Sequence, residues 1–379
     1  MREVAVIGTG MTRFGKHDAS LKALALDACR EALLDAGCPR IDALFVGNFM
    51  GGQLAGQEIL GSILASELGL GPVPTMKSEG ACASGGIAIR QAYQLVAAGV
   101  YDNVLVVGVE KMTHVPTNVV TAAINTAMDN DSNEGLSGLT FPGFFGVVAH
   151  RYMYEFGAGI EHVSMVALKN REYAVHNPKA QFQKPTSLEE IMQARIIAAP
   201  LGLYHCSPIT DGAAAVVISA GKKGVRILAS GQASGPPLMQ DIPDILSIGA
   251  IREAARQAYE QAGLGPEDID VAEVHDCFAI TEILAIEDLG FFEKGTGWKA
   301  VELGLTKHGG KVPVNTSGGL LSRGHPIGAT GVAQVIAVVD QLRGRSVNQV
   351  EGARIGLAQN LGGTGAYATV HIFEGQGVM

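Results

Sequence analysis

The chain has 379 residues, of which 47% are hydrophobic and 17% charged, and its formal net charge at pH 7 is −9. This charge argues against a general electrostatic affinity for nucleic acid. No apolar run is long enough to span a membrane as a helix. The length is sufficient for two or three domains, each with a hydrophobic core.

The five cysteines are scattered and include no C-x-x-C pair. This pattern disfavours a structural zinc site and fits a reducing cytosol better than a disulfide framework. The N-terminus runs directly into a strand-like segment, residues 3–8, with no basic and apolar signal sequence before it. We therefore expect a cytoplasmic protein.

Strand and helix signals alternate in the first part of the chain. A predicted amphipathic helix ends at Gly37, and a buried strand follows over residues 41–48. A glycine-rich turn around Cys82 then opens a helix over residues 87–98, which leads to a strand over residues 103–109. This alternation is typical of α/β proteins, in which crossover helices join parallel strands.

A different kind of sequence interrupts this alternation at residues 112–205. It is rich in Asn, Gly, Tyr and Met, and its strand signals are weak. We interpret it as an inserted loop domain with helices near residues 147–156 and 162–176. Such a long insertion is usually functional, as a lid or binding surface, and an oligomerisation flap is an equally good interpretation. Residues 211–218 then predict a strand that returns to the first half.

The second half repeats the order of the first. A helix ends at Gly263, a buried strand covers residues 269–274, and the motif His-Asp-Cys-Phe follows at His275. A second motif, Gly-His-Pro-Ile-Gly, contains His325 and leads to a helix over residues 332–342. We expect each motif to follow a strand and to open a helix. A strand over residues 354–359 ends the repeat.

These repeats predict two similar βαβ-rich halves. The expected division of the chain is an N-terminal half at residues 1–111, completed by a strand within residues 206–222, a loop domain at residues 112–205, and a C-terminal half at residues 223–379. The turns that follow the strands would then lie at one edge of each sheet, where α/β folds usually bind ligands.

Cys82 is the first candidate for chemistry. It lies in the sequence Ser-Glu-Gly-Ala-Cys-Ala-Ser-Gly-Gly, just before a predicted helix. Unpaired N–H groups and the positive end of a helix dipole favour a thiolate there and can stabilise an oxyanion. An isolated cysteine would more often be a small packed residue, but the glycines and the distant histidines favour a nucleophile.

The two histidine motifs supply the other candidates. His325 could be the base for the thiol or a donor to an acyl oxygen, and a histidine bonded within its own loop is the alternative. His275 and Cys277 are two residues apart, so in extended backbone both project to one side. Asp276 would point away and receives no catalytic role. Simple packing is the alternative for Cys277. The glycine-rich loop at residues 360–365 could donate backbone N–H groups.

Taken together, these motifs resemble those of the thiolases, specifically the branch of sterol-carrier-protein-type thiolases and archaeal acetoacetyl-CoA thiolases. The resemblance runs from end to end. Besides the His-Asp-Cys-Phe and Gly-His-Pro motifs, it includes Val109-Glu110-Lys111-Met112 and Ser207-Pro208-Ile209-Thr210-Asp211-Gly212. It implies the thiolase fold, in which the two halves form a five-layered α-β-α-β-α core with an inserted loop domain.

The resemblance also implies roles for three residues in acyl transfer. Cys82 would be the nucleophile that carries the acyl group. His325 would activate it and help form an oxyanion hole for the thioester enolate. His275 takes the place of an asparagine that many thiolases have in this loop, and would complete that hole.

Four further positions follow from the same resemblance. The backbone N–H groups of Gly362 and Cys82 would form a second oxyanion hole. Ser207 and Phe278 match positions that contact the pantetheine arm of CoA. Most thiolases carry an acid/base cysteine in a C-terminal Cys-x-Gly, where this chain has Asn360. In this branch Cys277 is expected to take over that role.

The implied activity is reversible and CoA-dependent: two acetyl-CoA condense to acetoacetyl-CoA and CoA, or a 3-ketoacyl-CoA is cleaved by thiolysis. The substrates are CoA thioesters, and no permanently bound cofactor or metal is expected. Thiolases are homodimers or homotetramers and serve lipid metabolism, which includes the mevalonate pathway. Archaeal relatives also suggest a complex with hydroxymethylglutaryl-CoA synthase and an OB-fold/zinc-ribbon protein.

Three alternatives stay open on the sequence. If Cys277 only packs, Cys82, His275 and His325 resemble the site of a decarboxylating 3-ketoacyl synthase. A non-catalytic acyl-CoA or lipid-binding protein would use the same cavity without a covalent adduct. A nicotinamide oxidoreductase has the weakest support, because Arg13 stands where a glycine or alanine should complete the first glycine-rich turn.

Overall fold

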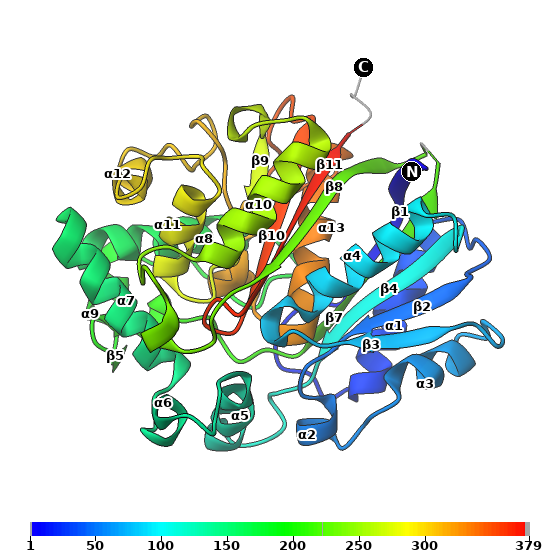
Figure 1. Ribbon diagram of the computed structural model, residues 1–379, viewed down its shortest axis with the longest axis horizontal. Helices are drawn as coiled ribbons and strands as arrows, with labels where there is room; N and C mark the ends of the chain where they lie inside the picture. Colours follow the sequence, from blue (N-terminus) through cyan, green and yellow to red (C-terminus); the bar gives the residue numbers. More distant parts are fainter. Residues whose placement is uncertain (1, 222, 376–379) are drawn as a thin grey trace.

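The computed structural model of the protein describes residues 2–221 and 223–375. It is a mixed α/β structure in which helices cover and separate the two parts of a large sheet (Figure 1). None of the helices in the described part of the chain has the length and apolarity that a membrane crossing requires.

The elements follow the predicted alternation. The first part contains β1 (Val4–Met11), α1 (Leu21–Asp35), β2 (Ala43–Gly47), α2 (Gly51–Ala55), α3 (Leu60–Glu67), β3 (Thr75–Ser78), η1 (Ala81–Ala83), α4 (Ser84–Ala97) and β4 (Asn103–Glu110). The middle part contains α5 (Thr117–Ile124), η2 (Asn125–Ala127), α6 (Asn133–Leu136), α7 (Phe141–Phe156), α8 (Ile160–His176), α9 (Leu188–Gln193), β5 (Ile196–Ala198), β6 (Leu201–Gly202) and η3 (Leu203–His205).

The last part begins with a strand that returns to the first sheet. Its elements are β7 (Gly212–Ala220), β8 (Val225–Ser234), η4 (Met239–Asp241), α10 (Gly249–Ala262), η5 (Pro266–Asp268), β9 (Val271–Glu273), α11 (Ala279–Asp288), α12 (Gly297–Glu302), η6 (Gly319–Arg323), η7 (Ile327–Ala329), α13 (Thr330–Leu342), β10 (Ile355–Gly362) and β11 (Tyr367–Glu374).

The sheet has the strand order β3-β2-β4-β7-β1-β8-β11-β10-β9. Strands β1 and β8 pair only at Ala5 with Arg226 and at Val6 with Val225. The sheet therefore consists of two parts, one from each half of the chain, joined by a short ladder. Strand β7 lies between β4 and β1. The division into residues 1–111, 112–205 and 223–379 stays a prediction.

The helices form the remaining layers. Helices α4 and α13 lie between the two parts of the sheet and share a core with residues from both, such as Ile89, Val335 and Phe373. Helices α1 and α3 cover the outer face of the first part, and α10 and α11 cover that of the second (Figure 1). The predicted five-layered fold is confirmed, and β4 is apolar between its end residues Asn103 and Glu110 because both of its faces are buried.

Two features of the structure differ most clearly from the prediction. Helix α7 begins at Phe141 rather than near residue 147, because the Thr140 side chain accepts a hydrogen bond from the N–H of Gly143 and caps the helix there. His325 does not follow a strand: the residues before it form the π-helical turn η6. The tertiary contacts that hold this turn are not local, so the sequence pattern did not reveal it.

Candidate active site

Helices α4 and α13 both begin at the centre of the molecule, and each is preceded by a short 3-10 turn. Cys82 lies in η1, the turn before α4. Its neighbour Ala81 has a φ of +50°, in the left-handed region that residues with a Cβ rarely adopt. Such strain persists where the surrounding structure enforces it, often at functional sites.

His275 lies in the loop between β9 and α11 and is almost fully buried. Its backbone N–H donates to Gln359 Oε1 at 2.9 Å, and its carbonyl accepts a hydrogen bond from Thr281 Oγ1 at 2.9 Å. Its ring Nδ1 lies 2.9 Å from Asn360 Nδ2. The ring is therefore fixed from both the backbone and the side chain.

His325 lies between η6 and η7. Its backbone N–H donates to Thr210 Oγ1 at 3.0 Å, and its ring Nδ1 lies 2.7 Å from Thr330 Oγ1 at the start of α13. Thr330 is the first residue of the helix that follows the motif. The ring is thus held by the first residue of α13, the helix that the sequence predicts over residues 332–342.

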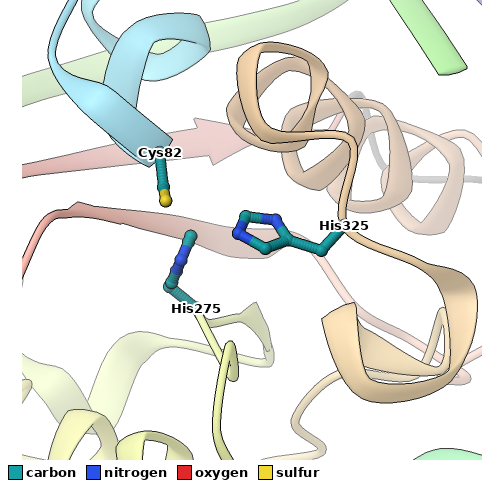
Figure 2. A group of neighbouring side chains, drawn as sticks. All are labelled: Cys82, His275 and His325. Carbon is teal, nitrogen blue, oxygen red and sulfur yellow. The ribbon is translucent and has the colours of Figure 1, made fainter. Parts of the chain in front are cut away.

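The structure brings Cys82, His275 and His325 together from three distant segments (Figure 2). The thiol sulfur and one nitrogen of each ring lie within 4.8 Å of one another. The two rings are nearly perpendicular, with centroids 5.1 Å apart. In the described part of the chain, this is the only group of three or more His, Cys, Asp or Glu side chains close enough to reach a common ion.

A cavity of about 1130 Å³ opens onto this group. Of the predicted site residues, Cys82, Cys277, His325, Ser207 and Phe278 line it. The N–H of Ser207 donates to the carbonyl of Cys277 at 2.9 Å, which ties two of the predicted positions together. The Phe278 ring stacks on the ring of Phe145 in α7, with the ring centroids 4.7 Å apart.

The predicted residues His275 and Gly362 are not among those that line the cavity. A ring nitrogen of His275 nevertheless lies within 4.8 Å of the Cys82 sulfur and of a ring nitrogen of His325. Gly362 is buried against the turn that carries Cys82, where an added Cβ would lie 2.1 Å from the carbonyl oxygen of Gly80. The next residue, Gly363, lines the cavity, and its backbone N–H is directed at the Cys82 thiol. Sequence analysis missed Gly363, although the glycine-rich loop was singled out.

The thiol of Cys82 is less acidic than its place at a helix start predicts. Cys82 is half-buried in the wall of the cavity, and desolvation raises its pKa to about 12. The nearby carboxylates of Glu110 and Glu79 act in the same direction, whereas the backbone N–H groups of Gly363 and Cys82 lower the pKa. The N–H groups favour the thiolate in the direction that the sequence predicts, but desolvation outweighs them and the thiol stays protonated at rest.

The other acid/base groups are also neutral at rest. Burial holds the pKa of His275 well below its ordinary value, and the neighbouring His325 acts in the same direction. Burial lowers the pKa of His325 to about 3, with a further contribution from Arg323. Burial and the proximity of Cys82 raise the pKa of the Cys277 thiol well above its ordinary value. The site thus holds two thiols beside two neutral imidazoles.

Asp276, between His275 and Cys277, is directed away from the cavity. Its carboxylate accepts hydrogen bonds from the N–H groups of Leu320 and Leu321 at 2.7 and 3.2 Å. These bonds hold the π-helical turn before His325, and so connect the two histidine motifs. No catalytic role was assigned to Asp276 from the sequence, and its position gives no reason to add one.

Comparison with known proteins places the chain in a family. Residues 4–222 match the family model of the thiolase N-terminal domain, and residues 231–375 match that of the thiolase C-terminal domain-like family. The chain belongs to the thiolase family. It is an acyltransferase enzyme, as the resemblance of its motifs implied.

This thiolase is 47% identical to the acetyl-CoA acetyltransferase of Methanothermobacter thermautotrophicus, over 99% of this chain and 100% of the relative. It is 36% identical to sterol carrier protein 2 of Bos taurus, over 96% of this chain and 70% of the relative. Among solved structures, the Ltp2-ChsH2(DUF35) aldolase matches with a TM-score of 0.84 and 27% identity, over 98% of both chains.

Proposed function

We propose that this thiolase condenses two molecules of acetyl-CoA to acetoacetyl-CoA and CoA, reversibly and through an acyl-Cys82 intermediate. The observation that carries the proposal is the convergence of Cys82, His275 and His325 within 4.8 Å, beside a cavity of about 1130 Å³ that Cys277 also lines. The 47% identity to an acetyl-CoA acetyltransferase supports acetyl as the transferred group.

The first half of the reaction forms the acyl-enzyme. Because the Cys82 thiol is neutral at rest, it needs a base as it attacks the thioester carbonyl, and His325 is within reach. The carbonyl oxygen becomes an oxyanion that the N–H of Cys82 and a glycine N–H of the 362–363 turn would hold. Each such donor contributes about 3 kcal/mol to transition-state stabilisation in other enzymes.

The second half makes the carbon–carbon bond. Cys277 is a thiol at rest, so it can act as a base only after it has given its proton to the departing CoA thiolate. It then removes an α-proton from the second acetyl-CoA, and His275 and His325 stabilise the enolate oxygen. The enolate carbon attacks the acyl group, and the Cys82 sulfur leaves and regains its proton from His325. Every proton is returned at the end of the cycle.

Substrate and partner contacts belong to the same proposal. Ser207 and Phe278 would contact the pantetheine arm of CoA, and both line the cavity. We also propose a homodimer or homotetramer in the cytoplasm, acting in the mevalonate pathway. We further propose a complex with hydroxymethylglutaryl-CoA synthase and an OB-fold/zinc-ribbon protein. The similarity to the aldolase Ltp2-ChsH2(DUF35), whose name includes a second component, supports only that a partner protein exists.

Mass spectrometry after mixing with acetyl-CoA tests the function. We expect one added acetyl group on Cys82 in the wild type and in Cys277→Ala, and acetoacetyl-CoA from the wild type only. Cys206→Ala is the matched control, because Cys206 lines the same cavity and has no assigned role. That variant should still carry acetyl on Cys82.

The outcomes separate the alternatives. Absence of acetyl on Cys82 in all three proteins would reject the thiolase mechanism, and acyl-CoA binding without an adduct would indicate a binding protein. Normal condensation by Cys277→Ala would remove the acid/base role of Cys277. If that variant also condensed malonyl thioesters, the chain would act as a decarboxylating synthase.

A further inference from the structure

Two hydrogen bonds, from Asn360 to His275 and between Thr330 and His325, determine which ring nitrogen of each histidine carries the proton. We propose that Asn360 and Thr330 hold the two rings in opposite tautomers: His275 carries its proton on Nε2 and acts as a donor, whereas His325 carries its proton on Nδ1 and acts as a base. Asn360 and Thr330 are therefore positioning residues. The inference rests on the proposed function and explains chemically why one histidine acts as a base and the other as a hydrogen-bond donor.

The orientation of the Asn360 amide is fixed by a backbone group. Its Oδ1 lies 3.3 Å from the backbone nitrogen of Gly86, which can only donate. The other end of the amide, Nδ2, must then face His275, at 2.9 Å from ring Nδ1. An amide NH₂ group has no acceptor. Nδ1 of His275 is therefore the acceptor and carries no proton.

The direction of the hydrogen bond at His325 is fixed in a similar way. Thr330 has one hydroxyl proton, and Oγ1 donates it to the carbonyl of Pro326 at 2.9 Å. The hydroxyl can then only accept from His325 Nδ1, which lies 2.7 Å away. Nδ1 of His325 is therefore protonated, and the bond made by one ring nitrogen sets the state of the other.

The tautomers matter because neither ring is an imidazolium at neutral pH. Burial lowers the pKa of both histidines, so each ring carries a single proton. The nitrogen left free on each ring is Nε2, and Figure 2 shows both rings directed toward Cys82. One Nε2 then donates a hydrogen bond, and the other accepts a proton. His325 can take the proton of Cys82, and His275 can donate to an oxyanion from the start.

Nitrogen-15 NMR of the histidine-labelled enzyme tests the tautomers directly. Spectra of His275→Gln and His325→Gln assign the two rings among the ten histidines. We expect the protonated nitrogen to be Nε2 in His275 and Nδ1 in His325. Asn360→Asp keeps the side-chain shape but replaces the donor by an acceptor, so Nδ1 of His275 should become protonated. A protonated His275 Nδ1 in the wild type would overturn the assignment.

Separate measurement of the rates of Cys82 acetylation and of condensation tests the different roles of the two histidines. In Thr330→Val the base loses its tautomer, so acetylation of Cys82 should slow by at least about tenfold, and Thr330→Ser should restore it. In Asn360→Leu the oxyanion donor is lost, so condensation should slow by about 100-fold. The rate of Cys82 acetylation in Asn360→Leu should stay within about twofold of the wild type, because His325 is untouched.

Equal slowing of both half-reactions in both variants would show that these residues act only on structure, and would overturn the inference. If Asn360→Leu does not fold, the spectrum of Asn360→Asp still decides the question at His275. A wild-type enzyme that forms no acetyl-Cys82 would reject the proposed function. The NMR spectra determine the tautomers independently of that result, because they require no reaction. The two failures are therefore distinguishable.

Discussion

Around Cys82, desolvation and neighbouring charge oppose the backbone N–H groups. Burial and the carboxylates of Glu110 and Glu79 disfavour the thiolate, and only the N–H groups of Gly363 and of Cys82 itself favour it. Glu110 is held in place by hydrogen bonds from the N–H groups of Met50 and Gly328 at 3.1 and 3.0 Å. The thiol is consequently protonated at rest, and the proposed mechanism therefore needs His325 to take its proton.

This resting state predicts how alkylation depends on pH. Because the pKa of Cys82 is raised to about 12, the thiolate fraction should rise about tenfold per pH unit between pH 7 and 9. The rate at which iodoacetamide modifies Cys82, followed by peptide mass spectrometry, should rise with the same slope. Cys82→Ala supplies the background from the other cysteines. A rate that levels off below pH 8 would mean that the thiolate is stabilised after all.

The sequence indicated the three side chains that converge at the site more readily than the residues that hold them in place. Cys82, His275 and His325 stand in short motifs with glycine or helix signals on both sides. Asn360, by contrast, lies 85 residues from His275 along the chain, and nothing near it in the sequence indicates that contact. Thr330 reads as an ordinary helix-starting residue. Roles of this kind depend on tertiary contacts that local patterns do not encode.

At the scale of elements, the site depends on close approach of two helix starts. An added Cβ at Gly85, in the first turn of α4, would lie 2.9 Å from the carbonyl oxygen of Gly328 in η7. One at Gly328 would lie 2.7 Å from the carbonyl oxygen of Gly47 and 2.8 Å from that of Val109. The atoms in the way are backbone atoms, which cannot move aside as a flexible side chain can. Only glycine allows the Cys82 and His325 turns to pack this closely.

We predict that Gly328→Ala displaces η7, and the His325 turn with it, from the ends of β2 and β4, whose backbone oxygens the added Cβ would meet. The extra methyl group should lower the free energy of unfolding by about 1–3 kcal/mol, as overpacking does elsewhere, and should slow acetylation of Cys82. Urea unfolding and the mass-spectrometric acetylation rate measure the two effects.

Gly249→Ala is the matched control, because an added Cβ there, at the start of α10, would meet no atom within 4 Å. It should leave both quantities nearly unchanged. A Gly328→Ala enzyme with normal stability and normal acetylation would contradict the packing argument.

The elements themselves were largely predictable. The helix that ends before Gly263 and the strand at residues 269–274 follow from local periodicity, and Gly263 adopts the left-handed conformation expected of a helix stop, with a φ of +66°. The π-helical turn η6 was not predictable. Its N–H groups bond to Asp276, which lies more than 40 residues earlier in the chain. A turn held by tertiary hydrogen bonds leaves no periodic signal.

Across the whole molecule, a buried polar network connects the middle part of the chain to the loops that carry His275 and His325. Lys169 of α8 lies 2.9 Å from Glu282 of α11, and both side chains are almost completely buried. The neighbouring Asn170 donates to Asp276 Oδ2 at 2.7 Å and to Glu282 Oε2 at 3.0 Å. Asp276 in turn holds the turn before His325. Helix α8, whose Arg171 lines the cavity, is thereby connected to both histidine motifs.

Lys169→Met should therefore destabilise the protein strongly. It leaves the Glu282 carboxylate buried without its cation, which costs about 3–5 kcal/mol in comparable buried pairs. The double variant Lys169→Met/Glu282→Gln removes the charge as well and should recover part of that loss. Lys22→Met, which breaks an exposed ion pair with Glu67 on the surface, should change the free energy of unfolding little. Equal stability of Lys169→Met and Lys22→Met in urea unfolding would show that the buried pair does not fasten α8 to the site.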